Sequence, residues 1–143
     1  MTANQPTEMR DVEVLAEDEC RRLLGSRTLG RLALVVDGTP QIFPVNYAFA
    51  EGVVIIRSAP GLKLQHSPMT EVAFETDMED AKAGIAWSVM VQGTAFDITD
   101  TLDTRYERLR HMRVEPEAPG KHDHWMGVYV HRISGRRFAL STL

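Results

Sequence analysis

Apolar and polar residues alternate along most of this chain, a pattern of period two that predicts β-strands rather than helices. In the segment 28–36, Leu32 and Leu34 fall on one face of the expected strand, whereas Arg31 and Ala33 fall on the other. Such alternation is typical of strands with one face in a core and the other toward solvent. We therefore expect a sheet protein in which one face of each strand is buried.

Tight turns join the first three predicted strands. The segments 40–49 and 53–58 follow 28–36, and the last of them is dense in β-branched residues. Asp-Gly at 37–38 and Glu-Gly at 51–52 lie between the strands, and such dipeptides favour two-residue hairpin turns. The three strands should pair antiparallel, because a parallel pair needs a long crossover between its strands.

Three more strand patterns follow, at 71–77, 86–99 and 124–140. Gly93, in the middle of the second, predicts a bulge or bend of the kind that curves a sheet into a barrel. Ser-Gly at 134–135 is a turn signal, so the last segment is either one strand or a strand pair. The sequence thus predicts about six strands.

Short helices and loops complete the pattern. The segment 15–24 carries acidic residues first and arginines last, an order that suits the helix dipole. The segment 103–113 repeats apolar residues at intervals of three. We expect one or two helical turns at 62–67, a loop at 79–84 and a mobile tail at 1–11. Together with the strands, these indicate an all-β barrel with helical decoration, or an α+β fold.

Size and composition limit the class of protein. The chain has 143 residues, of which 43% are hydrophobic and 25% charged, which is typical of one ordered domain, here 12–143. The net charge is −4 and the basic residues are scattered, so nucleic acid is not expected as a partner. No apolar run approaches the ~20 residues of a membrane helix. We expect a cytoplasmic protein with no membrane partner.

Thiol and metal chemistry receive little support from the sequence. Cys20 is the single cysteine, which excludes an internal disulfide framework and a zinc site made of several thiolates. An inert, partly buried thiol is its ordinary interpretation, and a catalytic thiol is the alternative. His122 and His124 could share one face of a strand, but no second group of ligands accompanies them. We predict no metal site.

Three segments together resemble a known family. They are GRLALVVDGTPQIFPVNYAF (30–49), VVIIRSAPGLKL (53–64) and AWSVMVQGTA (86–95), and the likeness covers roughly 12–138. The chain is similar to the pyridoxamine 5′-phosphate oxidase-like proteins, in particular to small actinobacterial-type and nitroimidazole-resistance-type members. The resemblance implies a six-stranded antiparallel FMN-binding split barrel that works as a homodimer, in which the second subunit covers the flavin.

A phosphate site is expected where the third strand ends. Arg57 closes that strand, Ser58 follows, and a Pro-Gly bend at 59–61 can fold Lys63 back toward Arg57. A guanidinium, an ammonium and nearby hydroxyl or backbone N–H groups are the donors that a phosphate prefers. Leu62 and Lys63 would open a helix whose free N–H groups favour an anion. The alternative is that both cations are merely solvated, and the resemblance favours the phosphate role.

The flavin ring needs hydrogen bonds at its pyrimidine edge and apolar cover on its faces. The resemblance places the backbone of Val45 and Tyr47, and the side chain of Asn46, against the ring. Trp87 and Ser88 begin a later strand and are candidates for the cover that the second subunit supplies. The alternatives are that Asn46 is an outward polar residue between two buried ones, and that Trp87 is an ordinary core or interface tryptophan.

Function follows from the cofactor. The resemblance implies an FMN-dependent oxidoreductase that is reduced by a nicotinamide-type donor and acts on a small organic molecule; no catalytic side chain is identified. Arg137 is a candidate for binding substrate, and a solvated charge is its alternative. Three other functions stay open: a split barrel that binds a deazaflavin coenzyme, one that binds haem, and a non-enzymatic flavin store or sensor.

Overall fold

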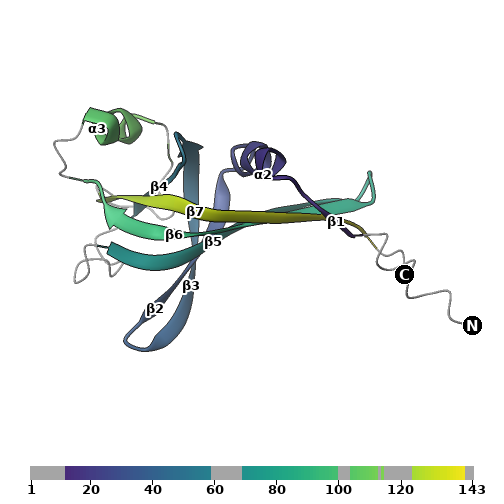
Figure 1. The fold of residues 1–143 in the computed structure, drawn as a ribbon, viewed down its shortest axis with the longest axis horizontal. Helices are drawn as coiled ribbons and strands as arrows, with labels where there is room; N and C mark the ends of the chain where they lie inside the picture. Colours follow the sequence, from purple (N-terminus) through teal and green to yellow (C-terminus); the bar gives the residue numbers. More distant parts are fainter. Residues whose placement is uncertain (1–11, 59–68, 100–103, 113, 115–123, 141–143) are drawn as a thin grey trace, which may run out of the picture.

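A computed structural model describes residues 12–58, 69–99, 104–112, 114 and 124–140. They form seven strands and two helices (Figure 1). The strands are β1 (Val12–Val14), β2 (Leu29–Val36), β3 (Thr39–Ala50), β4 (Val53–Ser58), β5 (Met69–Asp80), β6 (Ile85–Asp97) and β7 (His124–Ala139). The helices are α2 (Glu17–Leu24) and α3 (Thr104–Arg110).

Six of the strands close into a ring. Their order is β7-β4-β3-β2-β5-β6, every recorded pair is antiparallel, and a further pairing of β6 with β7 completes the circuit. The expected antiparallel barrel is therefore confirmed. The expected number of strands was wrong, because β1 adds a seventh strand beside the end of β7. With three residues, β1 is too short to show the alternation that identifies a strand.

The two predicted hairpin turns are confirmed by their backbone angles. Asp37 and Gly38 have φ values of 52° and 77°, and Glu51 and Gly52 have 56° and 76°. Two successive residues with positive φ form the turn whose twist matches that of antiparallel strands. The meander of β2, β3 and β4 is thus set locally by the sequence.

The bulge expected at Gly93 is also present. Gln92 faces Arg132 while Gly93 faces Val130, so the pairing leaves out His131 on β7. A Cβ atom on Gly93 would lie 1.9 Å from the carbonyl oxygen of Tyr129. Only glycine allows the two strands to approach this closely at the bend.

The turn signal at 134–135 does not produce a turn. β7 runs without interruption through both residues, so the alternative of one long strand is correct. Gly135 is buried beneath α2, where an added Cβ would lie 2.8 Å from the sulfur of Cys20. Glycine serves close packing at this position rather than chain reversal.

Other boundaries differ modestly from expectation. The loop predicted at 79–84 is a tighter turn, because β5 and β6 continue to Asp80 and from Ile85. The first helix starts at Glu17 rather than at Leu15, whose N–H donates to the carbonyl of Gly135. The second helix is confirmed at 104–110. The tail at 1–11 and the turns at 62–67 lie outside the described residues.

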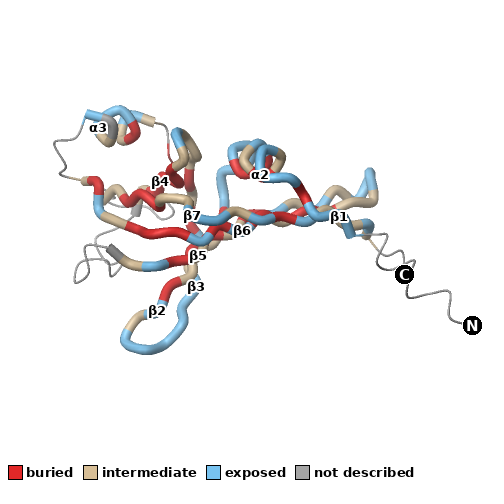
Figure 2. The backbone as a smooth tube through the Cα atoms, viewed as in Figure 1, coloured by how far each residue is buried: buried red, intermediate tan, exposed pale blue. Residues whose placement is uncertain are grey.

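The core lies inside the ring, and α2 covers one side of it. Leu32 on β2 and Phe74 on β5 are fully buried, as the alternation predicted. Cys20 and Leu24 of α2 are also buried in this cluster, which Figure 2 colours red. Each fully buried side chain of this size contributes about 1.5–3 kcal/mol. α3 packs separately on the outside of β4, through Leu109.

The ring is split on one side. β2 pairs with β5 over three residues only, Arg31–Ala33 with Ala73–Glu75. Beyond these pairs the β2–β3 hairpin projects away from the rest of the sheet, and its tip is exposed (Figures 1 and 2). Within the described residues, neither helix is long and apolar enough to cross a membrane.

Candidate functional site

Asn46 and Arg57 follow the last recorded pair of β3 and β4, on the outer face of the barrel. The last recorded pair between β3 and β4 joins Tyr47 to Ile56, so Asn46 and Arg57 are the next residues on their strands. Tyr47 and Ile56 point into the core, and successive side chains on a strand alternate. The guanidinium carbon of Arg57 lies 5.5 Å from the ring centroid of Trp125. This cation–π contact holds the cation at the strand end where the sequence predicted it.

Of the other residues predicted to bind the phosphate, the structure describes only part. Ser58 is the last residue of β4 and pairs with His124. Leu62 and Lys63 lie outside the described residues. The structure therefore supplies the guanidinium and the strand end, and the role of the lysine stays a prediction.

Tyr47 holds the barrel together from the inside. Its side chain and that of Val45 are buried. The Tyr47 hydroxyl donates to the carbonyl of Leu24 at 2.5 Å, and its backbone N–H donates to the carbonyl of Thr28 at 2.9 Å. Burial raises the pKa of Tyr47, which keeps the hydroxyl protonated as a donor. Of the three neighbouring residues predicted to meet the ring, only Asn46 presents its side chain on the outer face.

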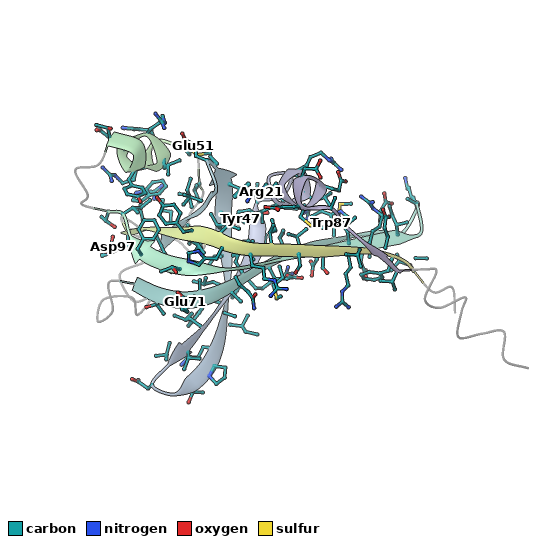
Figure 3. All side chains as sticks on the ribbon, viewed as in Figure 1. Arg21, Tyr47, Glu51, Glu71, Trp87 and Asp97 are labelled. Atoms are coloured by element: carbon teal, nitrogen blue, oxygen red, sulfur yellow. The ribbon has the colours of Figure 1, made fainter. Side chains whose placement is uncertain are left out.

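Trp87 and Ser88 lie far from Arg57 within one chain. Arg57 pairs with Trp125 near the start of β7, whereas Trp87 pairs with Arg137 near its end. The twelve residues between these positions correspond to about 40 Å along a strand. Trp87 itself is buried in the core (Figure 3), and Ser88 is half-buried. A single chain cannot bring both ends of β7 to one flavin.

Arg137 is engaged in ion pairs that hold β1 and α2 to β7. Its guanidinium lies 3.3 Å from a carboxylate oxygen of Glu13 and 3.0 Å from one of Glu19. Hydrogen bonds from Arg22 and from Arg137 lower the pKa of Glu19 to about 2. These contacts link three elements of the fold, and the role of Arg137 in binding substrate stays a prediction.

An open groove follows the split between the hairpin and β5. Its volume is about 560 Å³, within the range of small-molecule sites. Ala33 and Ala73 form a flat apolar floor, exposed Ile42 stands on the hairpin side, and Glu71 and Gln92 form a polar edge. The sequence predictions missed this groove, since alternation marks these side chains as outward without showing which strands separate.

A charged cluster lies along the same outer face. One nitrogen of Arg31 lies 3.2 Å from Glu75 and 3.1 Å from Asp77. Partial burial and the neighbouring Asp77 raise the pKa of Glu75 to about 7, although Arg31 opposes this shift. Glu75 and exposed Met90 line a second hollow of about 340 Å³ that shares the floor of the groove. This face therefore mixes apolar surface with a titratable carboxyl group near neutrality.

The described residues contain no cluster of three His, Cys, Asp or Glu side chains that could hold a metal ion. His124 lies 3.9 Å from Asp97 as a single pair, and His122 is outside the described residues. Cys20 is fully buried, whereas a partly buried thiol was predicted, and burial raises the pKa of its thiol. A thiol of this kind is a poor nucleophile at neutral pH.

A family model described as pyridoxamine 5′-phosphate oxidase matches residues 16–137. Among curated proteins, the chain is 34% identical over 113 residues to the uncharacterized protein Rv0080 of Mycobacterium tuberculosis, covering 74% of each chain. The family-model match spans the first helix and the six strands of the ring, except for the last residues of β7.

Solved structures share the fold. A protein of Corynebacterium glutamicum, assigned provisionally as a pyridoxamine 5′-phosphate oxidase, is 32% identical with a TM-score of 0.80, and the match covers 93% of this chain and 97% of that one. The FAD binding protein from Mycobacterium smegmatis is 33% identical with a TM-score of 0.72, over 89% of this chain and 98% of that one. The overall fold of this chain is thus shared with other proteins.

Proposed function

Because the chain belongs to the pyridoxamine 5′-phosphate oxidase family, we propose that it is a cytoplasmic flavin-dependent oxidoreductase that binds FMN as a homodimer. A reduced nicotinamide-type donor would supply the electrons, and a small organic molecule would accept them. The observation that carries the proposal is the position of Arg57, oriented by Trp125 beside Asn46 on the outer face.

The residues present fit a flavin mononucleotide. Arg57 offers a guanidinium for the phosphate, and Lys63 is the second cation that the sequence predicts. Asn46 is adjacent and can hydrogen-bond to the polar part of the ligand. When bound, a flavin supplies hydride and electron transfer, so the protein needs only to hold it, orient it and limit its exposure to water.

We infer that a second copy of the chain completes the site. Trp87 and Ser88 lie about 40 Å along β7 from the strand pair that carries Arg57, which is too far for one flavin. A two-fold partner can bring its own Ser88 end to the Arg57 end of the first copy, and the same contact is then made twice. The homodimer and the covering role of the Trp87–Ser88 segment are therefore one proposal and are tested together.

Mixing two inactive variants tests the composite site. Arg57→Ala removes the phosphate contact and Ser88→Arg obstructs the covering segment, so each variant alone should lose flavin. After the two are unfolded and refolded together, half of the dimers are mixed and one of their two sites is intact. We expect about a quarter of the wild-type flavin load to return. If mixed dimers form but bind no flavin, then Arg57 of one copy and Ser88 of the other do not belong to one site.

FAD is the second candidate cofactor. It is favoured by the 33% identical protein of M. smegmatis, whose described ligand is FAD. The Arg57 site does not separate the two flavins, because both carry a phosphate next to the ribityl chain. The mass of the ligand released from the purified protein decides between them.

The absorption spectrum of the purified protein tests the function itself. Oxidised flavin, deazaflavin and haem differ in their bands, and we expect those of a flavin. Arg57→Ala and Lys63→Ala should reduce the load, whereas Lys82→Ala, which removes an exposed cation from the β5–β6 turn, should not. If the protein binds flavin but shows no turnover with any nicotinamide donor, the proposed enzyme activity is contradicted and a non-enzymatic flavin store is favoured.

A further inference from the structure

The large apolar side chains that are exposed gather on one side of the molecule. Within the described residues they are Val12, Val14, Leu29, Val35, Ile42 and Met90. Met90 lines one hollow with Val14 and a second hollow with Ile42, which also lines the groove with Val35. Alternation along β1 and β2 places Val12 and Leu29 on this same side. A patch of this extent is typical of a surface that binds another macromolecule, and we call it the apolar patch.

Two surfaces meet in a corner at the apolar patch. The first is the outer face of β5, β6 and β7, which carries Met90. The second is the β2–β3 hairpin, which carries Val35 and Ile42 and projects from the side of these strands opposite α2 (Figure 1). They join where Ala33 pairs with Ala73. A corner can receive a second corner of the same shape, because a two-fold contact joins unlike surfaces in two equivalent places.

Opposite charges lie on the two sides of β6. On β5, the carboxylates of Glu75 and Asp77 share one nitrogen of Arg31, at 3.2 Å and 3.1 Å, so that negative charge is in excess there. On β7, Arg132 and Arg136 are exposed and have no ion-pair partner within the described residues. Such a surface is complementary to a second copy of itself. The carboxylates would repel an anionic membrane or nucleic acid, so these partners are disfavoured.

We propose that the apolar patch is the contact between two copies of this chain, with the β5–β7 face of each copy seated against the β2–β3 hairpin of the other. The inference rests on the proposed function and assigns a surface to its homodimer. Leu29, at one border of the patch, pairs with Asn46, which lies near the strand end that carries Arg57. The partner's Ser88, two residues from Met90 on the seated face, is thereby directed toward that strand end.

The dissociation constant of the dimer, measured by sedimentation over a dilution series, tests this surface. Ile42 is 69% exposed in the single chain, so Ile42→Asp should leave the fold intact while it places a charge in the contact. We expect it to raise the dissociation constant at least about tenfold. Arg136→Glu should also raise it, with a smaller effect in about 1 M salt, which screens charges. The control Glu107→Lys, on α3, should leave it unchanged.

Circular dichroism verifies that each variant is folded. If wild-type protein is dimeric and both patch variants dissociate as it does, the proposed surface is overturned and the proposed homodimer survives. If wild-type protein is a monomer at every concentration, both fail. Methyl NMR gives an independent measurement: the signals of Ile42 and Met90 should shift as the dimer dissociates, whereas that of Leu109, buried against β4, should not. Unchanged Ile42 and Met90 signals would overturn the proposal.

Discussion

Replacing Gly93 by alanine should be among the most damaging single changes in this fold. The new methyl group would lie 1.9 Å from the carbonyl oxygen of Tyr129 and 2.9 Å from its carbonyl carbon. These are backbone atoms in the longest ladder of the sheet, so no side-chain rotation can relieve the contact. Overpacking a core usually costs about 1–3 kcal/mol. We place Gly93→Ala at the upper end, about 3 kcal/mol.

Urea unfolding followed by circular dichroism measures this loss. For a chain of this length, about 3 kcal/mol corresponds to a fall in melting temperature of roughly 6–12 °C. Gly25→Ala is the matched control, because its methyl group would meet only ordinary contacts of 3.7 Å at a φ of −74°. Its stability should change by less than about 1 kcal/mol. A loss below about 1 kcal/mol for Gly93→Ala would refute the close strand approach at the bulge.

Two further changes test the packing of α2 and the charged face. Tyr47→Phe leaves the buried carbonyl of Leu24 without its hydrogen-bond donor. The free energy of unfolding in urea should therefore fall by about 1–3 kcal/mol with an unchanged m value. An unchanged midpoint of unfolding would contradict this hydrogen bond. The pKa of Glu75 is raised from 4.5 to about 7. Between pH 4.5 and about pH 7 the folded chain therefore binds more protons than the unfolded chain. The free energy of unfolding then falls as pH rises through this range. Unfolding at pH 5 and pH 8 should show Glu75→Gln gaining stability relative to wild type at the higher pH, and a constant difference would contradict the shift.

The strands could be predicted because their information is local. Phe74 and Leu32 are buried between neighbours that are charged or small, and each dipeptide turn has backbone angles that its own residues favour. β1 could not be found in this way, because its three residues become a strand only by pairing with the end of β7. The turn expected at Gly135 failed for a related reason, since contact with Cys20 explains that glycine better than local conformation does.

The candidate site depends on pairings between distant segments. Arg57 was predicted from the strand end that carries it, and its contact with Trp125 needed the β4–β7 register. The groove exists because β2 leaves β5 after three residue pairs, which no pattern within either strand reveals. The distance between Trp87 and Arg57 likewise follows from how β6 and β4 align on β7. Local patterns therefore identified side chains, and the sheet registers decided which of them can act together.

The phosphate site at Arg57 is tested most directly by comparing the affinities of FMN and riboflavin, which differ only in the phosphate. Wild-type protein should bind FMN about tenfold to a hundredfold more tightly, the range expected for a charge-assisted contact. Arg57→Ala should lose most of that advantage, and Lys82→Ala should keep it. Equal affinity of wild-type protein for the two flavins would contradict the account.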